Sequence, residues 1–241
     1  MEFISMFWQW LTLETPATNP WILLIAIIAG FTLACIPAIW KQTRLFATYI
    51  HEAGHALVAI LTGRRVTRIR LEADTSGTTE HVGTRGLGML LTAFAGYPAP
   101  ALAGWGIAVA LFASRPNWVI AGFAALALLL LLVQHSLRGL AVTLIIGLSM
   151  WGLYSINSII SSIMLSIVAG YLIAASPRTI IELHNIRSRA KKMGMHPAET
   201  HSDADSLTAQ TGIPAPIWEF LFLAVSGWTI YSIIETFIHH I

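Results

Sequence analysis

The sequence has little charge. Only 11% of its 241 residues are Asp, Glu, Lys or Arg, whereas a soluble globular domain carries about 25%. Fourteen basic and twelve acidic side chains cannot cover the surface of a water-soluble protein of 26.3 kDa. A net charge of +2 provides no basic footprint for a polyanion, so no nucleic-acid partner is expected. These shortages exclude a soluble enzyme, a disordered chain and a nucleic-acid-binding protein.

Cysteine and the usual secretion signals are also scarce. Cys35 is the only cysteine, so the chain cannot form an internal disulfide. No Asn-x-Ser/Thr motif occurs, and residues 1–20 contain Glu2 and Glu14 but no basic residue, unlike the start of a secretory signal. These absences are in keeping with a prokaryotic plasma membrane.

Apolar residues are abundant. They make up 56% of the chain, and the mean hydropathy is +0.69. Because a backbone that crosses hydrocarbon must satisfy its own hydrogen bonds, each long apolar run is expected to be a helix. The fifth and sixth runs have almost no residue between them, so we predict an all-α polytopic membrane protein with six to seven transmembrane helices. The runs are 21–40, 45–62, 87–113, 118–134, 137–154, 156–176 and 217–238.

Two polar segments interrupt the runs of a single membrane-embedded domain, 1–241. In residues 63–85, apolar residues alternate with Thr and Arg around a turn-like ADTSGT, which predicts a short β-hairpin. Residues 177–216 begin as a basic helix and continue as a polar loop. If the chain has seven spans, eleven basic residues lie on the same side of the membrane as both polar segments. The other three (Lys41, Arg44 and Arg115) lie on the opposite side. The excess predicts that the hairpin and the polar loop are cytoplasmic.

The segment His51-Glu52-Ala53-Gly54-His55 is an H-E-x-x-H motif. Residues four apart share one face of a helix, so both imidazoles can hold one metal ion. The neighbouring Glu52 can act as general base on a metal-bound water whose pKa zinc lowers towards about 7. The pattern predicts a hydrolytic zinc site, although an interhelical hydrogen-bond cluster would use the same residues.

A hydrolytic zinc site needs a third protein ligand. The only Asp residues are Asp74, Asp203 and Asp205, and Asp74 lies in the predicted hairpin turn, where Asp is expected for local reasons. In Ser202-Asp203-Ala204-Asp205, either Asp can be a ligand, but Ser202 followed by two acidic residues is also typical of a helix N-terminus.

Three segments together resemble the site-2 protease clan, the M50 intramembrane zinc metallopeptidases, and in particular the compact M50B-like branch. HEAGHALVAILTGRRV resembles the metal-binding helix of the clan. AGYPAPALAG, residues 95–104, is similar to the branch pattern Ala-Gly-Tyr-x-x-Pro-Ala. SDADSLTAQTGIPAPIWEFLF, residues 202–222, is similar to the Ser-Asp-Ala-Asp-x-Leu and Ile-Pro-x-x-x-Trp pattern before the last helix.

The resemblance implies an integral-membrane zinc endopeptidase with one Zn²⁺ per chain, which cleaves membrane-protein or peptide substrates in or near transmembrane segments. It implies His51, His55 and Asp203 as metal ligands, with Asp205 as the alternative third ligand, and Glu52 as the catalytic base. The hairpin segment VTRIRL would then pair with an extended substrate, which makes Val66, Arg68 and Arg70 candidate substrate-binding residues. The chain departs from the better-known site-2 proteases because it has no Asp-Gly, which their third-ligand motif contains.

The predicted spans create a conflict. Five spans between residues 45 and 176 place the start of the metal-binding helix and the Asp203 loop on opposite sides of the membrane. Either this loop therefore reaches into the membrane or one span is re-entrant. The broken segment with Pro98 and Pro100 is a candidate for the latter. Two other functions use the same residues, a non-catalytic scaffold and a small-solute or ion transporter, but a scaffold has no need of Glu52.

Overall fold

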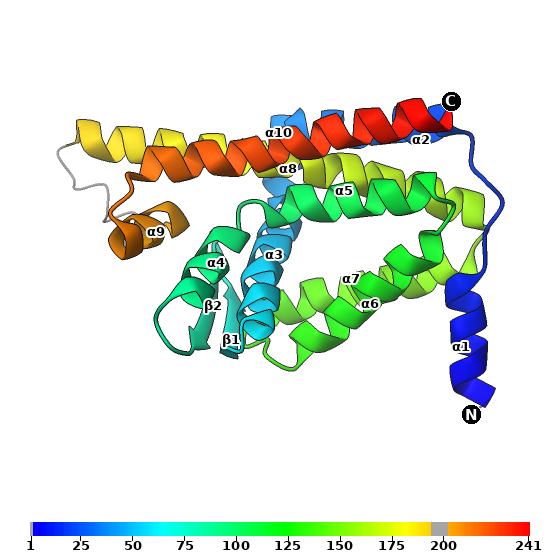
Figure 1. The fold of residues 1–241 in the computed structure, drawn as a ribbon, viewed down its shortest axis with the longest axis horizontal. Coiled ribbons are helices and arrows are strands. Elements are labelled where there is room, and N and C mark those ends of the chain that lie inside the picture. The colour runs from blue at the N-terminus through cyan, green and yellow to red at the C-terminus, as the bar shows by residue number, and fades with distance from the viewer. Residues whose placement is uncertain (1, 194–201) are drawn as a thin grey trace.

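The computed structural model describes residues 2–193 and 202–241. In these residues the chain forms ten helices and one two-stranded sheet (Figure 1). The helices are α1 (Glu2–Thr12), α2 (Pro20–Cys35), α3 (Pro37–Leu61), α4 (Leu87–Ala95), α5 (Ala99–Phe112), α6 (Pro116–Leu131), α7 (Leu137–Ser155), α8 (Ser158–Lys192), α9 (Asp203–Thr211) and α10 (Ala215–His240). The strands are β1 (Arg65–Leu71) and β2 (Gly77–Val82).

Helices α2, α5, α8 and α10 run side by side and form a bundle (Figure 1). The closest approach is between α2 and α8. A Cβ atom on Gly30 would overlap the carbonyl oxygen of Ile167, and one on Gly170 would overlap that of Ile27. Glycine at both positions therefore allows the two backbones to touch, which is how helices associate tightly in a membrane.

Helix α8 combines the predicted span 156–176 with the basic helix that the sequence predicts after it. It begins after Asn157, whose side chain accepts a hydrogen bond from the backbone N–H of Ile159, and it continues through Pro177 to Lys192. The predicted polar segment 177–216 therefore begins as the second half of α8, and Arg189, Lys191 and Lys192 stabilise the negative end of its dipole. The middle of that segment, 194–201, lies outside the described residues.

Two of the predicted spans are broken by prolines. The run 21–40 crosses the junction at Pro37, where α2 and α3 bend by 102°, and the run 87–113 bends by 72° between α4 and α5 at Pro98. Proline lacks the N–H that an unbroken helix needs, and it disfavours helical backbone at the preceding residue. The positions of both bends therefore follow from the local sequence, but the bend angles do not.

The predicted count of six to seven spans is not confirmed. Three helices of the described chain, α7, α8 and α10, are long and apolar enough to cross a membrane, and the number rises to five if each bent pair is one span. Helix α6 is apolar but has only 16 residues. The sidedness argument used seven spans, so it stays a prediction. The fold class itself, a helical membrane protein with a small hairpin, is confirmed.

The predicted hairpin is present as the antiparallel pair β1–β2, with Ile69 opposite Thr79. The outer edge of β1 contacts the turn between α6 and α7: the N–H of Ile69 donates to the carbonyl of Val133 at 2.8 Å, and the N–H of His135 donates to the carbonyl of Ile69 at 2.9 Å. In the described part of the chain, β2 pairs only with β1. The free edge of the hairpin is therefore that of β2.

Helix α9 is held against α4, α8 and α10 by a small apolar cluster. Leu207 of α9 is fully buried there with Ile180 of α8 and Phe222 of α10, and Phe94 of α4 packs against them. This cluster is separate from the main core of the bundle. It brings the first turn of α9 next to the metal-binding motif on α3.

Candidate metal centre

The two histidines of the H-E-x-x-H motif lie on one face of α3. Their Nε2 atoms are 3.0 Å apart, and the rings meet edge to face with centroids 4.7 Å apart. The ring of His51 also contacts the ring of Tyr97 edge to face, with centroids 4.8 Å apart. Both histidines therefore direct the same nitrogen towards one point, as the four-residue spacing predicts.

The orientation of His55 is set by the backbone of α4. Its Nδ1 atom lies 2.7 Å from the carbonyl oxygen of Thr92. Because a carbonyl oxygen only accepts, Nδ1 carries a proton and donates it, so Nε2 holds the lone pair when the ring is neutral. A metal-binding histidine typically uses its second nitrogen in this way, since the contact fixes both the tautomer and the plane of the ring.

Asp203 reaches the same point from the first turn of α9. Its Oδ2 atom lies 3.1 Å from Nε2 of His51 and 3.2 Å from Nε2 of His55. Burial by itself would raise the pKa of Asp203, but the imidazoles of His55 and His51, when they are protonated, outweigh it and hold the pKa below its ordinary value. Asp203 is therefore a carboxylate at neutral pH, which is the form that binds metals.

These three donor atoms fit a zinc ion. Bonds of about 2.0–2.1 Å at tetrahedral angles place neighbouring donors about 3.3 Å apart, close to the 3.0–3.2 Å between the three atoms here. The buried Oδ2 of Asp203 accepts no hydrogen bond from the described residues, and a bound cation would supply the missing partner. Among these residues, His51, His55 and Asp203 form the one group whose donors converge in this way.

Gly96 forms one wall of this centre at the break between α4 and α5. A Cβ atom on Gly96 would overlap Nε2 of His55 and would lie 2.6 Å from Nε2 of His51. Any side chain at residue 96 would therefore occupy the space at which both nitrogens are aimed. The proline-induced bend places this backbone against the ligands.

Glu52 is buried beside the hairpin. Its Oε2 atom accepts a hydrogen bond of 2.6 Å from the hydroxyl of Thr79 on β2, and its Oε1 atom faces Gly77, where a Cβ would overlap it. A cavity of about 260 Å³ opens between the hairpin, α3, α4 and α9. Glu52, His55 and Asp203 all line it, so the candidate base and two of the candidate ligands share one space.

Asp205 makes different contacts. Its Oδ2 atom accepts hydrogen bonds from the backbone N–H (3.1 Å) and the hydroxyl (2.7 Å) of Ser202, which completes a capping box at the start of α9. Its Oδ1 atom pairs with the guanidinium of Arg187 on α8. The structure thus brings Asp203, and not Asp205, to the two imidazoles.

Arg187 is the centre of a buried ion network. Besides pairing with Asp205, its Nε atom lies 3.0 Å from Oε1 of Glu219 on α10, and Oε2 of Glu219 lies 2.8 Å from Nδ1 of His184. The side chains of Arg187, Asp205 and Glu219 are 11%, 10% and 6% exposed. The network joins α8, α9 and α10, and its member Asp205 belongs to the same turn of α9 as Asp203. Sequence reasoning placed Arg187 in the basic helix that begins at residue 177 and gave no signal for this network.

The candidate substrate-binding residues on β1 do not line the cavity. Val66 is buried, Arg70 is exposed, and Arg68 lies 3.9 Å from Glu80 on the neighbouring strand. The hairpin residues that line the cavity are on β2: Gly77, Thr78, Thr79 and His81. The sequence carried no signal for the choice between the strands, because both edges of an isolated hairpin are equivalent.

The chain matches a known protein family. The model of the family described as Peptidase M50B-like matches residues 24–233, which include α3 and α9. Comparison with the curated proteins and with the solved structures gives no match.

Proposed function

Because this chain belongs to the Peptidase M50B-like family, we propose that it is a zinc endopeptidase of the membrane, which cleaves peptide bonds in or near transmembrane segments of membrane proteins. The observation that carries the proposal is the convergence of His51 and His55 from α3 with Asp203 from α9. The long apolar helices and the family place the protein in a membrane. We propose the prokaryotic plasma membrane as its location.

His51, His55 and Asp203 would hold one Zn²⁺ and leave a fourth position open. When bound, zinc makes water more acidic and polarises a scissile carbonyl. Glu52 takes the proton of the attacking water and delivers it to the leaving nitrogen. The hydroxyl of Thr79 fixes the plane of the Glu52 carboxylate, since it donates to one of the two oxygens. The backbone carbonyl of Thr92 keeps His55 in the tautomer that binds metal.

We further propose that the substrate enters as an extended strand along the hairpin, since an unpaired strand edge can bind a peptide through its backbone. The edge of β2 borders the cavity, whereas the edge of β1 is bonded to the α6–α7 turn at Ile69. Arg68 and Arg70 would then act on the substrate from outside the cavity, through charge, and Val66 through the packing of the hairpin.

Two other functions are less well supported. A scaffold of the same fold does not need a buried Glu52 held by Thr79. A transporter would need charged groups on several facing helices of the bundle. In the part of the chain that the structure describes, the least exposed charged side chains and histidines are instead Glu52 and His55 on α3, Arg64 before the hairpin, and Glu219 near the start of α10.

The test is cleavage by the purified, zinc-loaded protein in lipid nanodiscs. The substrates are a library of unstructured peptides and single-span proteins, and new chain ends are read by mass spectrometry. Glu52→Gln should bind zinc as wild type does but cleave about 10²–10⁴-fold more slowly, the usual contribution of a general base. Glu235→Gln, an exposed position on α10, is the control and should cleave normally. If Glu52→Gln cleaves as fast as the wild type, Glu52 is not the general base. If the wild type produces no new chain ends, the proposed peptidase activity is wrong.

A further inference from the structure

The structure holds the two histidines of the metal centre in different ways. The Nδ1 atom of His55 donates to the carbonyl of Thr92, and the side chain of His55 is 9% exposed. The side chain of His51 is 19% exposed, and in the described residues no hydrogen bond involves its Nδ1 atom. A metal-binding histidine usually has a partner for its second nitrogen, which fixes the plane of the ring. Within the described chain, a different contact therefore orients His51.

Tyr97, in the turn between α4 and α5, makes that contact. Its ring meets the ring of His51 edge to face, with centroids 4.8 Å apart and an angle of 88° between the planes. The same ring stacks on Phe222 of α10, with centroids 5.2 Å apart and planes that differ by 20°. Both arrangements are favoured geometries of aromatic rings. Tyr97 is thus held against α10 while it contacts the imidazole of His51.

The backbone of Tyr97 is fixed separately. Pro98 and Pro100 lack the N–H groups of a continuous helix and interrupt its hydrogen bonds here. The hydroxyl of Ser176 on α8 donates to the carbonyl of Tyr97 at 2.7 Å, and its oxygen lies 2.8 Å from the hydroxyl oxygen of Ser226 on α10. Both serines are buried. Serine side chains of neighbouring helices satisfy backbone groups at such breaks in membrane helices. The ring and the backbone of Tyr97 are therefore both anchored to the bundle.

Phe222 connects this arrangement to the third ligand. It is fully buried in the apolar cluster that contains Leu207 of α9, and Asp203 lies in the first turn of the same short helix. One aromatic ring of α10 therefore supports His51, through Tyr97, and also the helix that carries Asp203. The ligands from two distant parts of the chain share this support.

We infer that Tyr97 is a positioning residue of the metal centre, which keeps the imidazole of His51 aimed at the metal through its ring and not through its hydroxyl. This role rests on the metal site of the proposed function. Among the described residues, the Tyr97 hydroxyl forms no hydrogen bond with either histidine, whereas the ring contact is direct. The tyrosine of the segment AGYPAPALAG, which takes no part in the proposed mechanism, thereby acquires a function.

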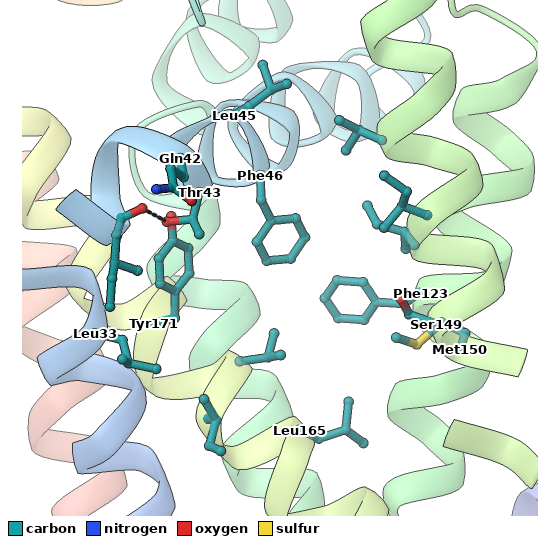
Figure 2. Close-up of a pocket in the computed structure, with 16 residues that line it drawn as sticks. Leu33, Gln42, Thr43, Leu45, Phe46, Phe123, Ser149, Met150, Leu165 and Tyr171 are labelled. Atoms are coloured by element: carbon teal, nitrogen blue, oxygen red, sulfur yellow. Dashed lines mark hydrogen bonds between the residues drawn. The ribbon is translucent and has the colours of Figure 1, made fainter. Parts of the chain in front are cut away.

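Cobalt binding by the full chain in detergent tests this role. Co²⁺ can replace zinc, and its visible absorption reports the coordination geometry. Tyr97→Leu should bind Co²⁺ about tenfold or more weakly, the range for groups that support metal ligands, and with a changed spectrum. Tyr97→Phe keeps the ring and should match the wild type. The control is Phe46→Leu on α3, because Phe46 points towards Phe123 in an apolar cavity of about 500 Å³ that no metal ligand lines (Figure 2). This variant should leave affinity and spectrum unchanged.

A second pair of variants tests the backbone anchor and decides the matter if Tyr97→Leu does not fold. Ser176→Ala removes the hydrogen bond to the carbonyl of Tyr97 and should weaken Co²⁺ binding about two- to tenfold, the usual effect of one hydrogen bond. Ser166→Ala is the matched control. Ser166 is equally buried on α8 but donates within its own helix, to the carbonyl of Ser162 at 2.8 Å. Equal affinities of these two variants would contradict the anchoring of Tyr97.

A third measurement needs no metal. In the metal-free protein, the ring current of Tyr97 displaces the NMR signals of the His51 imidazole, so these signals should move in Tyr97→Leu and stay in place in Tyr97→Phe. Wild-type affinity and spectrum in Tyr97→Leu would overturn the role of Tyr97. A Tyr97→Phe variant as weak as Tyr97→Leu would also overturn it, because the hydroxyl would then be the active group. If the wild type bound no Co²⁺, the proposed metal centre would be wrong, and the NMR signals would still decide whether Tyr97 holds the ring of His51.

Discussion

The backbone of Gly96 packs directly against the imidazole of His55, so closely that a Cβ atom at residue 96 would overlap the Nε2 atom of His55. This relationship joins the α4–α5 bend to the metal-binding motif of α3. It gives the glycine of the segment AGYPAP a role at the site that its sequence did not reveal.

Replacing Gly96 with alanine should weaken zinc binding by about tenfold or more, the range seen when groups next to metal ligands are changed. The added methyl group occupies space at which the imidazole nitrogens are aimed, so the rings must turn away. Chelator competition measures the affinity. Gly106→Ala is the matched control, because a Cβ on Gly106 meets no atom within 4 Å. Equal affinities in the two variants would show that the wall at Gly96 is not part of the centre.

Asp203→Ala should abolish zinc binding at a ratio of one per chain, because it removes one of three ligands. Asp205→Ala should keep that ratio, because Asp205 contacts Ser202 and Arg187 and not the imidazoles. Loss of the capping contact should cost about 1 kcal/mol of stability, in addition to the loss of the pair with Arg187. Metal analysis of the purified proteins distinguishes the two variants, and the reverse result would make Asp205 the ligand.

Arg187→Met should release α9 from α8 and α10. The change leaves the buried carboxylates of Asp205 and Glu219 without their cation, a loss that costs about 3–5 kcal/mol for a buried pair. Because Asp203 belongs to the same short helix, zinc should dissociate faster, while the bundle keeps its helical circular dichroism. Arg189→Met, at an exposed position of the same helix, should change neither property. If zinc dissociates from Arg187→Met at the wild-type rate, the network does not hold Asp203 at the metal centre.

Gly170→Ala should destabilise the bundle by about 1–3 kcal/mol, the usual cost of overfilling a packed interface. The methyl group would overlap the carbonyl oxygen of Ile27 and force α2 away from α8. Thermal unfolding in detergent tests this expectation. Gly147→Ala on α7 meets no atom within 4 Å and should be neutral or slightly stabilising. Equal melting temperatures would contradict the close contact of α2 and α8.

The hairpin should lose stability in mild acid. Burial and the nearby Arg64 guanidinium lower the pKa of His81 from its ordinary 6.5, and the Nε atom of Arg64 donates to its Nδ1 atom at 3.1 Å. The unfolded chain therefore binds the proton more tightly, so this contribution is complete above pH 6.5 and is lost as the pH falls. In NMR titrations, Arg64→Gln should raise the pKa of His81 and Arg65→Gln should not. A wild-type value at or above 6.5 would contradict the contact.

The sequence by itself determined the features that depend on neighbouring residues. The spacing of His51 and His55 places both rings on one helical face, the alternation in residues 65–82 makes the hairpin, and Pro37 and Pro98 end the helices before them. Such features are local, because backbone geometry fixes which side chains can meet within a few residues.

Only the tertiary structure decided the direction of the helices and the choice of the third ligand. A run of apolar residues predicts a helix but not its axis, so α3 was counted as a separate span although it bends by 102° from α2. Asp203 and Asp205 are chemically identical and lie on different sides of the first turn of α9. Contacts with α3 and with Arg187 of α8 give each its role. Those contacts join segments far apart in the chain, and no local pattern encodes them.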